Sequence, residues 1–225
     1  MNRHSCEPTC TGPIAPHPVV YSAYRRRLRT GDIALARSDG HWPDRLIAWG
    51  TGSPYVHATM IGWCGDVLML AEARQWRESH LVTLSSQVKR WPGLYDVYRV
   101  RRPFQSGVAW NTMVRATGTP YGWRQLLAVA LGKVLGLRGQ GPRAANAGPS
   151  PCGAWPYPQN DSAEDYPRDC SALVNFACRA GGRVPRLELP DARVEPGHFA
   201  DPAFARYLCT LVWEEFQILD LRPRA

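Results

Sequence analysis

The chain has 225 residues and a mass of 25.1 kDa, and its 44% of hydrophobic and 20% of charged residues exclude bulk disorder and allow a sizeable core. The net charge of +8 favours anionic partners such as nucleic acid, lipid headgroups or the acidic polymers of a cell envelope, although a codon bias toward Arg explains it equally well. No zinc-finger spacing, aromatic RNA-binding signature or basic heptad segment is present, so the sequence predicts no nucleic-acid module.

The first segment, 1–20, carries four Pro and no hydrophobic periodicity, which is typical of an extended arm. The arm lacks the apolar run of a signal peptide, and no stretch reaches the roughly 20 apolar residues of a membrane span. We therefore expect a protein that is made in the cytoplasm and has no membrane span. The seven Cys cannot all pair, and Cys6 and Cys10 are close enough for a disulfide or a shared metal but match no common zinc pattern. No metal site and no cofactor is predicted.

The remaining residues, 21–225, are predicted to form one domain. A turn over 30–32 leads into a short buried strand, 33–36, and apolar residues at near-helical spacing predict a helix over 41–50. Strand-like runs follow at 56–63, 67–73 and 95–101, and Gly65-Asp66 joins the first two as a tight hairpin turn. Two helices are expected next, over 104–117 and 123–131.

A long segment rich in Gly, Pro, Ala, Asn and Ser occupies 136–168, and such insertions are typically lids, binding loops or disordered segments. A helix begins abruptly after it at Cys170, with Asp169 as the N-cap candidate, and ends at Gly181-Gly182. A last strand is expected over 207–213. Together these elements predict an α+β fold in which an antiparallel sheet packs against the helix that carries Cys170.

Cys170 lies where a nucleophilic cysteine is most easily activated. The unpaired backbone N–H groups and the positive end of the helix dipole both stabilise a thiolate in the first turn of a helix. The same N–H groups can bind the oxyanion that forms when a thiolate attacks a carbonyl group. The alternative is a small apolar residue that faces the core, which is the interpretation we give to Cys178 on the same helix.

Two polar residues in apolar strands are candidate partners for Cys170. His57 lies in the segment 55–62 and Glu72 in 68–73, and each needs a hydrogen-bond partner if it is buried. In the predicted hairpin, Glu72 is expected opposite Cys64 or Trp63, and direct contact with His57 stays open because the register is not fixed. A carboxylate beside the imidazole would fix its tautomer and support its charged form.

Four segments in this order resemble the circularly permuted branch of the NlpC-like papain superfamily of cysteine peptidases and amidases: 31–35, 53–58, Glu72 and 169–174. In that branch the strand with the His precedes the helix with the Cys. The resemblance implies a papain-like fold over most of the ordered chain, with Cys170 as nucleophile, His57 as general base and Glu72 as the residue that orients the base. The insertion at 136–168 and the Cys-bearing arm depart from the family pattern.

The resemblance also suggests residues that contact the substrate. Tyr55 matches an aromatic residue found before the His, and Tyr121 matches a Tyr that can line the cleft ahead of the Cys helix. We add Asp169 and Ser171, which flank the nucleophile, to this candidate substrate-binding set.

Other polar residues are weaker candidates. Asp161, Glu164 and Asp165 are acidic residues in one loop that could bind a divalent cation, but neighbouring acids on a loop are usually solvated. His41 and His198 could each act as a spare base, and neither has a sequence neighbour that supports this role.

The sequence therefore predicts a cysteine hydrolase that cleaves an amide bond through a thioester, with peptidoglycan as the preferred substrate because a basic, aromatic-rich surface suits an anionic glycopeptide. A phage enzyme carried in the virion, with tail proteins as partners, would reconcile a cell-wall substrate with the missing signal peptide. Two alternatives stay open: a catalytically silent papain-like module with an assembly role, and an intracellular amidase or acyltransferase acting on lipid or peptide.

Overall fold

The computed structural model describes residues 17–74, 77–122, 168–187, 189 and 191–214. The strands are β1 (Pro18–Val20), β2 (Asp32–Arg37), β3 (Tyr55–Cys64), β4 (Val67–Ala73), β5 (Ser79–Thr83), β6 (Tyr95–Val100) and β7 (Ala205–Val212). The α-helices are α1 (Tyr21–Tyr24), α2 (Trp42–Thr51), α3 (Leu84–Arg90), α4 (Ser106–Arg115) and α6 (Cys170–Ala180). The 3-10 helices are η1 (Arg25–Arg27), η3 (Asp191–Arg193) and η4 (Pro196–Ala200).

The seven strands form one sheet in the order β1-β7-β6-β2-β3-β4-β5. Every neighbouring pair is antiparallel except β1 and β7, which run parallel. The α+β class predicted from the sequence is therefore confirmed, whereas the expectation of a purely antiparallel sheet is corrected to a mixed one. The parallel pair arises because Pro18–Val20, at the end of the segment expected to be an arm, adds to the sheet edge formed by β7.

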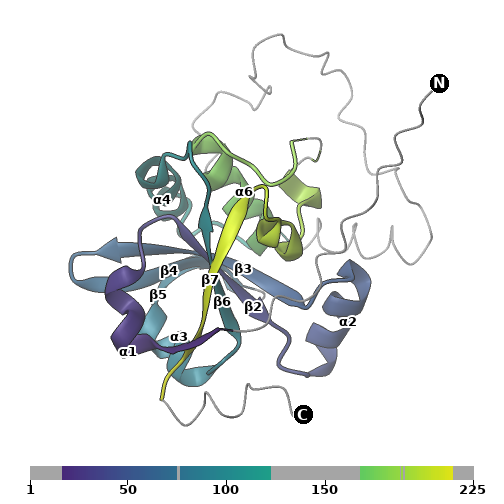
Figure 1. The fold of residues 1–225 in the computed structure, drawn as a ribbon. Coiled ribbons are helices and arrows are strands. Elements are labelled where there is room, and N and C mark those ends of the chain that lie inside the picture. The colour runs from purple at the N-terminus through teal and green to yellow at the C-terminus, as the bar shows by residue number, and fades with distance from the viewer. Residues whose placement is uncertain (1–16, 75–76, 123–167, 188, 190, 215–225) are drawn as a thin grey trace, which may run out of the picture.

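Different helices cover the two faces of the sheet (Figure 1). On one face, α4 and α6 pack together and against β3 and β4, around a cluster that includes Met60, Trp110 and Leu173. On the other face, α1 and α3 cover a second cluster that includes Leu70 and Leu84. Because residues along a strand alternate between the faces, the two clusters take alternate residues of the central strands.

Two local features fix the part of the sheet that leads to the site. The β3–β4 hairpin turns at Gly65, whose φ of 56° lies in the left-handed region that favours glycine. Along β3, a Cβ atom at Gly62 would lie 2.2 Å from the ring of Trp110, so the glycine lets α4 approach the strand closely. Gly65 thus allows the tight turn, and Gly62 allows α4 to pack closely on β3, the strand that carries His57.

Most of the predicted elements are present, including the helices near 41–50 and 104–117, the 65–66 hairpin and the helix that starts at Cys170. The short strand β5 and the helix α3 were not predicted. The expected helix over 123–131, the insertion at 136–168 apart from Arg168, and Cys6 and Cys10 lie outside the described residues. Among the residues that are described, no helix combines the length and the apolar character needed to cross a membrane.

Candidate active site

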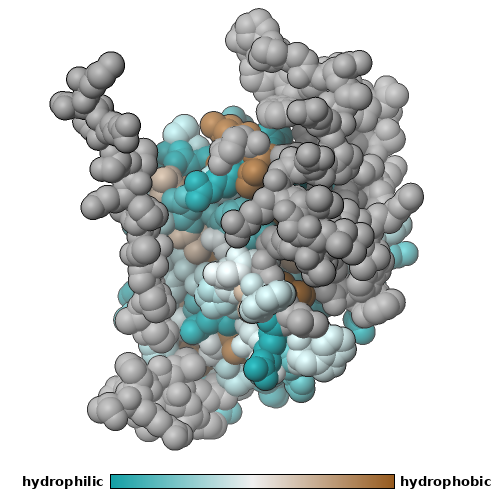
Figure 2. All heavy atoms as spheres, turned by 90° about the vertical axis from the view of Figure 1, so that its right-hand side faces the viewer, coloured by the Kyte–Doolittle hydropathy of each residue, from teal (hydrophilic) through white to brown (hydrophobic). Residues whose placement is uncertain are grey.

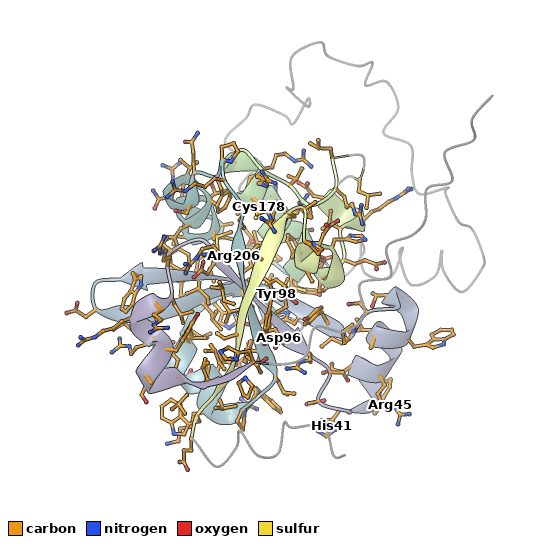
Figure 3. All side chains as sticks on the ribbon, in the orientation of Figure 1. His41, Arg45, Asp96, Tyr98, Cys178 and Arg206 are labelled. Carbon is orange, nitrogen blue, oxygen red and sulfur yellow. The ribbon has the colours of Figure 1, made fainter. Side chains whose placement is uncertain are left out.

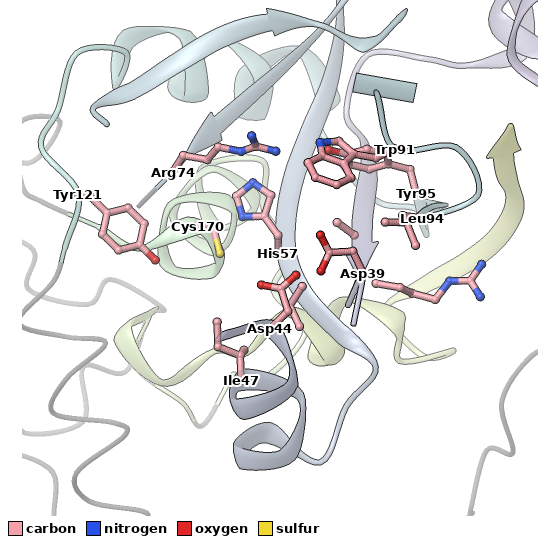
Figure 4. A pocket seen from close by; sticks show the side chains of 13 residues that line it. Asp39, Asp44, Ile47, His57, Arg74, Trp91, Leu94, Tyr95, Tyr121 and Cys170 are labelled. Atoms are coloured by element: carbon pink, nitrogen blue, oxygen red, sulfur yellow. The ribbon is translucent and has the colours of Figure 1, made fainter. Parts of the chain in front are cut away.

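The antiparallel order of the central strands brings four strand ends to one edge of the sheet. The end of β2, the start of β3, the end of β4 and the start of β6 meet there, because neighbouring antiparallel strands alternate in direction. A pocket of about 310 Å³ lies at this edge, closed on one side by the first turn of α6 and on another by α2 (Figure 4). Its lining includes His57 of β3 and Cys170 of α6.

Cys170 is the first residue of α6 and is 7% exposed. The side chain of the N-cap residue Asp169 accepts hydrogen bonds from the backbone N–H of Ala172 (2.7 Å) and from the hydroxyl of Ser171 (3.0 Å). This capping starts the helix at Cys170, so the thiol lies at the positive end of the helix dipole and faces the pocket.

A β-bulge orients His57. Ala36 pairs with His57 but the next residue, Arg37, pairs with Tyr55, so Val56 is an extra residue in β3. Tyr55 consequently packs in the same core cluster as Ala58, which strict alternation would place on the opposite face. The bulge therefore reverses which side chains of β3 point to each face, directly beside His57, whose imidazole lines the pocket.

His57 contacts both of its predicted partners. Its Nε2 lies 2.9 Å from Oε2 of Glu72, and the ring lies beside the thiol of Cys170 (Figure 4). Burial alone would lower the pKa of His57, but the negative charge and hydrogen bond of Cys170 and the bond to Glu72 together raise it to about 10. The site thus favours the imidazolium form of His57, next to the Glu72 carboxylate.

Glu72 is 1% exposed and is surrounded by cations. Its Oε1 faces Nε of Arg74 at 3.3 Å and Nε2 of His80 at 3.4 Å, while Oε2 bonds His57. Burial would raise the pKa of Glu72, but the hydrogen bond from His57 and the nearby cationic groups of His80 and Arg74 hold it well below its usual range. Glu72 is therefore a fixed negative charge behind His57.

The pocket lining carries side chains of both charges. Arg37 and Arg74 are among the lining residues, and Asp39, just before α2, and Asp44, in the first turn of α2, lie together on the α2 side (Figure 4). Burial and then the neighbouring Asp39 raise the pKa of Asp44 above its ordinary value. Aromatic rings complete the lining; they belong to Trp91, Tyr95 and Tyr121. On the α2 side of the molecule, hydrophilic residues predominate among those described, with small separate hydrophobic areas (Figure 2).

Of the four expected substrate-binding residues, Tyr121 lines the pocket and the others point elsewhere. Asp169 and Ser171 are buried and bond to each other. The hydroxyl of Tyr55 donates to Asp96 (2.9 Å) and lies 2.7 Å from the hydroxyl of Tyr98. Figure 3 shows Asp96 and Tyr98 in the sheet, so Tyr55 belongs to a buried network behind the pocket.

The expected register of Glu72 was wrong. Cys64 pairs with Val67 and Met60 with Ala71, so each step along β4 moves one residue back along β3. Glu72 comes after Ala71 and therefore lies near the start of β3, diagonal to His57, rather than near Cys64. The correct count from a two-residue turn would have predicted the contact.

The spare candidates lie apart from the pair. His41 is exposed just before α2, with Nε2 3.9 Å from Asp39, and Nδ1 of His198 accepts a bond from the backbone N–H of Glu195 in the cap of η4. Asp161, Glu164 and Asp165 lie outside the described residues. Sequence reasoning missed Arg74, His80, Asp39 and Asp44; the one sequence signal was the position of Arg74 just after the strand that carries Glu72.

Comparisons with known proteins give a fold and no family. No protein-family model and no curated protein matches the chain. Among solved structures, it is similar to the metalloprotein YiiX from Escherichia coli O157:H7, with a TM-score of 0.51 and 16% identity over 81% of this chain and 97% of that one. In the described part of our chain, no group of three or more His, Cys, Asp or Glu is placed to hold a metal ion. The likeness to YiiX shows that the two chains share their overall fold.

Proposed function

We propose that the protein is a cysteine hydrolase of the permuted papain-like type that cleaves amide bonds through a thioester. The observation that carries this proposal is the arrangement of Cys170, His57 and buried Glu72 at a pocket, with the thiol at a helix N-terminus. The order of a strand with the His before a helix with the Cys also fits the permuted family.

The proposed reaction has two steps. The thiolate of Cys170 attacks the carbonyl carbon, and the backbone N–H of Cys170 at the start of α6 stabilises the oxyanion. The imidazolium of His57 then protonates the leaving amine, the C–N bond breaks and a thioester remains. In the second step His57 takes a proton from water, the resulting hydroxide attacks the thioester, and the acid leaves as the Cys170 thiol group is restored.

The pocket chemistry favours a peptide over a lipid amide. A peptide with free termini or charged side chains carries both carboxylate and ammonium groups, which the arginines and the acidic pair Asp39 and Asp44 in the pocket lining would complement. A fatty acyl chain offers no partner to these charges. We therefore keep the stem peptide of peptidoglycan as the preferred substrate; the virion assignment concerns segments outside the described residues and stays a prediction.

The decisive experiment compares the thiols within one chain. Purified protein is treated with iodoacetamide across a pH series, and the labelling rate of each Cys is read by mass spectrometry. Cys64, which is exposed, serves as the internal reference thiol. We expect Cys170 to react faster than Cys64 below the ordinary thiol pKa of ~8.5, although Cys170 is far more buried.

Substrate assays follow on the same preparation. Soluble peptidoglycan peptides and fatty acyl amides are incubated with wild type and with Cys170→Ser, and the products are identified by mass. Cleavage of the peptides by wild type alone supports the proposal. Cleavage of acyl amides alone would select the lipid amidase alternative, and labelling of Cys170 no faster than that of Cys64 would leave a silent assembly module.

A further inference from the structure

His80 lies on β5 directly across from Glu72 in the β4–β5 pair. Its side chain is 24% exposed, and β5 is the edge strand at the opposite end of the sheet from β1. Cross-strand partners point to the same face of a sheet, so the imidazole reaches the carboxylate from the side away from His57. Glu72 therefore lies between two imidazoles, with one oxygen directed at each.

The hydrogen-bond pattern of His80 requires a proton on both ring nitrogens. Nδ1 lies 2.8 Å from the backbone carbonyl oxygen of Glu78, which can only accept, so Nδ1 carries a proton. In the neutral ring, Nε2 would then turn a lone pair toward the negative Oε1 of Glu72 at 3.4 Å. Only the imidazolium form of His80 makes both contacts favourable.

Oε1 of Glu72 depends on these cations. It is buried, and no atom among the described residues meets hydrogen-bond geometry with it; Arg74 and His80 face it as ion-pair partners. Nε of Arg74 approaches Oε1 of Glu72 at 3.3 Å, while Nη2 of Arg74 donates a hydrogen bond to the side-chain oxygen of Gln87. A buried carboxylate oxygen without a donor is costly, so loss of the His80 proton would loosen the carboxylate.

We infer that His80 is a positioning residue for the proposed hydrolase: as an imidazolium it bridges the Glu78 carbonyl and Oε1 of Glu72, and so holds the carboxylate in the orientation that bonds His57. His80 does not touch the pocket and acts only through Glu72. The inference rests on the proposed function for its catalytic meaning, whereas the bridge itself is testable without a substrate.

The other charged groups around His80 do not provide the same bridge. Arg77 precedes β5 and lowers the pKa of His80, but the contact with the Glu72 carboxylate, the largest contribution, raises it despite partial burial. On the packed helix α3, Lys89 lies over the ring of Trp213 and Arg90 over that of Trp91. Among the described residues, Glu72 is thus the anion that holds the imidazolium form, together with the carbonyl of Glu78.

The test follows the histidine rings by NMR, with a chelator present so that no metal ion replaces the proton. In wild type we expect His80 to titrate above the ordinary imidazole pKa of 6.5; His17, an exposed residue next to β1 at the far edge of the sheet, offers a control position. The Nε2–H signal of His57 should be sharp below the His80 titration and broaden above it. His17→Gln is the matched control and should change neither behaviour.

Two variants separate positioning from simple stability. In His80→Gln the side-chain amide can donate to Oε1 at every pH, so the His57 signal should stay sharp across the series. In His80→Ala the signal should be broad throughout, and Cys170 alkylation at pH 6.5 should fall about fivefold, the effect expected for one hydrogen bond of ordinary strength. Titration of His80 at or below pH 6.5, or an unchanged His57 signal in His80→Ala, would overturn the inference.

Failure of the inference and failure of the proposed function give different results. If Cys170 is activated equally in wild type and His80→Ala, the hydrolase proposal stands and the role of His80 is lost. If Cys170 is unreactive in wild type while the His57 signal still follows the His80 titration, the bridge is present and the hydrolase proposal fails.

Discussion

The two cysteines of α6, Cys170 and Cys178, share one helix but have different surroundings. Cys170 faces the pocket beside His57, whereas Cys178 is 0% exposed in the core between the sheet and α4 (Figure 3). Burial and then the charge of Asp191 raise the pKa of Cys178 far above its ordinary value. Cys170 instead lies at the N-terminus of the helix and beside the His57 imidazole, whose own pKa is raised.

The comparison shows that the helix supplies only part of the activation. Cys178 lies in the last turns of α6, near the negative end of the helix dipole, and packs with Leu173 and Val174. The strands supply the rest, because His57 and Glu72 reach Cys170 from β3 and β4. A reactive cysteine in this fold therefore requires the first turn of α6 and one edge of the sheet at the same time.

Replacing each cysteine in turn gives the largest contrast. Cys170→Ala removes the nucleophile, so we expect peptide hydrolysis to fall by roughly 10³-fold or more. Cys178→Ala should leave the rate within about twofold and cost about 1 kcal/mol of unfolding free energy for the lost core contacts. Initial rates and urea unfolding of both variants check this; equal loss of activity in both would mean that the comparison is wrong.

His57→Ala tests whether the imidazole is what makes Cys170 more reactive than the other thiols. We expect alkylation of Cys170 at pH 7 to slow by about 10²-fold, because the variant loses the positive charge of the imidazolium beside the thiol. Labelling of the exposed Cys64 in the same sample should not change. A uniform change at Cys64 and Cys170 would instead indicate that the variant is partly unfolded.

The sequence was sufficient to identify the site residues that stand out from their immediate neighbours in the chain. Asp169 before Cys170 is a recognisable N-cap, and His57 and Glu72 stand out as polar residues in apolar strands. The remaining parts of the site depend on contacts between distant segments. The strand β5 has too short and too polar a sequence, Ser79–Thr83, to stand out, so the His80 contact was not foreseen.

Two further parts of the site have no signal in the sequence. The bulge at Val56 changes which side chains of β3 share a face, and a strictly alternating strand does not predict it. The acidic wall formed by Asp39 and Asp44 depends on how α2 is placed against the sheet edge. That placement comes from tertiary packing, which local propensity does not encode.

Glu72→Gln tests the carboxylate behind the pair. The amide keeps the shape but removes a buried charge that faces three cationic groups, so we expect a loss of about 2 kcal/mol of unfolding free energy at pH 6. The NMR titration should also show a lower pKa for His57, because Glu72 helps to raise it.

The pH dependence of this loss has a defined sign. The folded pKa of Glu72 is lowered, so its stabilisation is present above the ordinary value of 4.5 and is lost as pH falls toward the folded value. The folded pKa of His57 is raised to about 10. The stabilisation that comes from charged His57 is therefore complete below pH 6.5 and is lost as pH rises to about 10. The difference between wild type and Glu72→Gln, measured by urea unfolding, should therefore be largest between pH 4.5 and 6.5. A constant difference from pH 4 to 10 would contradict the ion-pair account.

The smallest effects are expected at Asp169, which caps the Cys170 end of α6. Asp169→Ala loses the bonds to Ala172 and Ser171 and should cost about 1 kcal/mol of unfolding free energy. Asp169→Asn keeps an acceptor oxygen at the cap and removes a negative charge next to the thiolate. It should therefore be nearly as stable as wild type, with Cys170 alkylated slightly faster.

The pH profile distinguishes the cap from the charge. Burial raises the pKa of Asp169, more than its bonds to the backbone of Ala172 and to Ser171 lower it. A raised carboxyl pKa means that the folded state favours the protonated form, so wild type should lose stability as pH rises through the folded value. Asp169→Asn cannot titrate, so unfolding curves from pH 3 to 7 should show this loss in wild type alone. If Asp169→Asn is as unstable as Asp169→Ala, the carboxylate charge itself, and not only the acceptor oxygen, stabilises the first turn of α6.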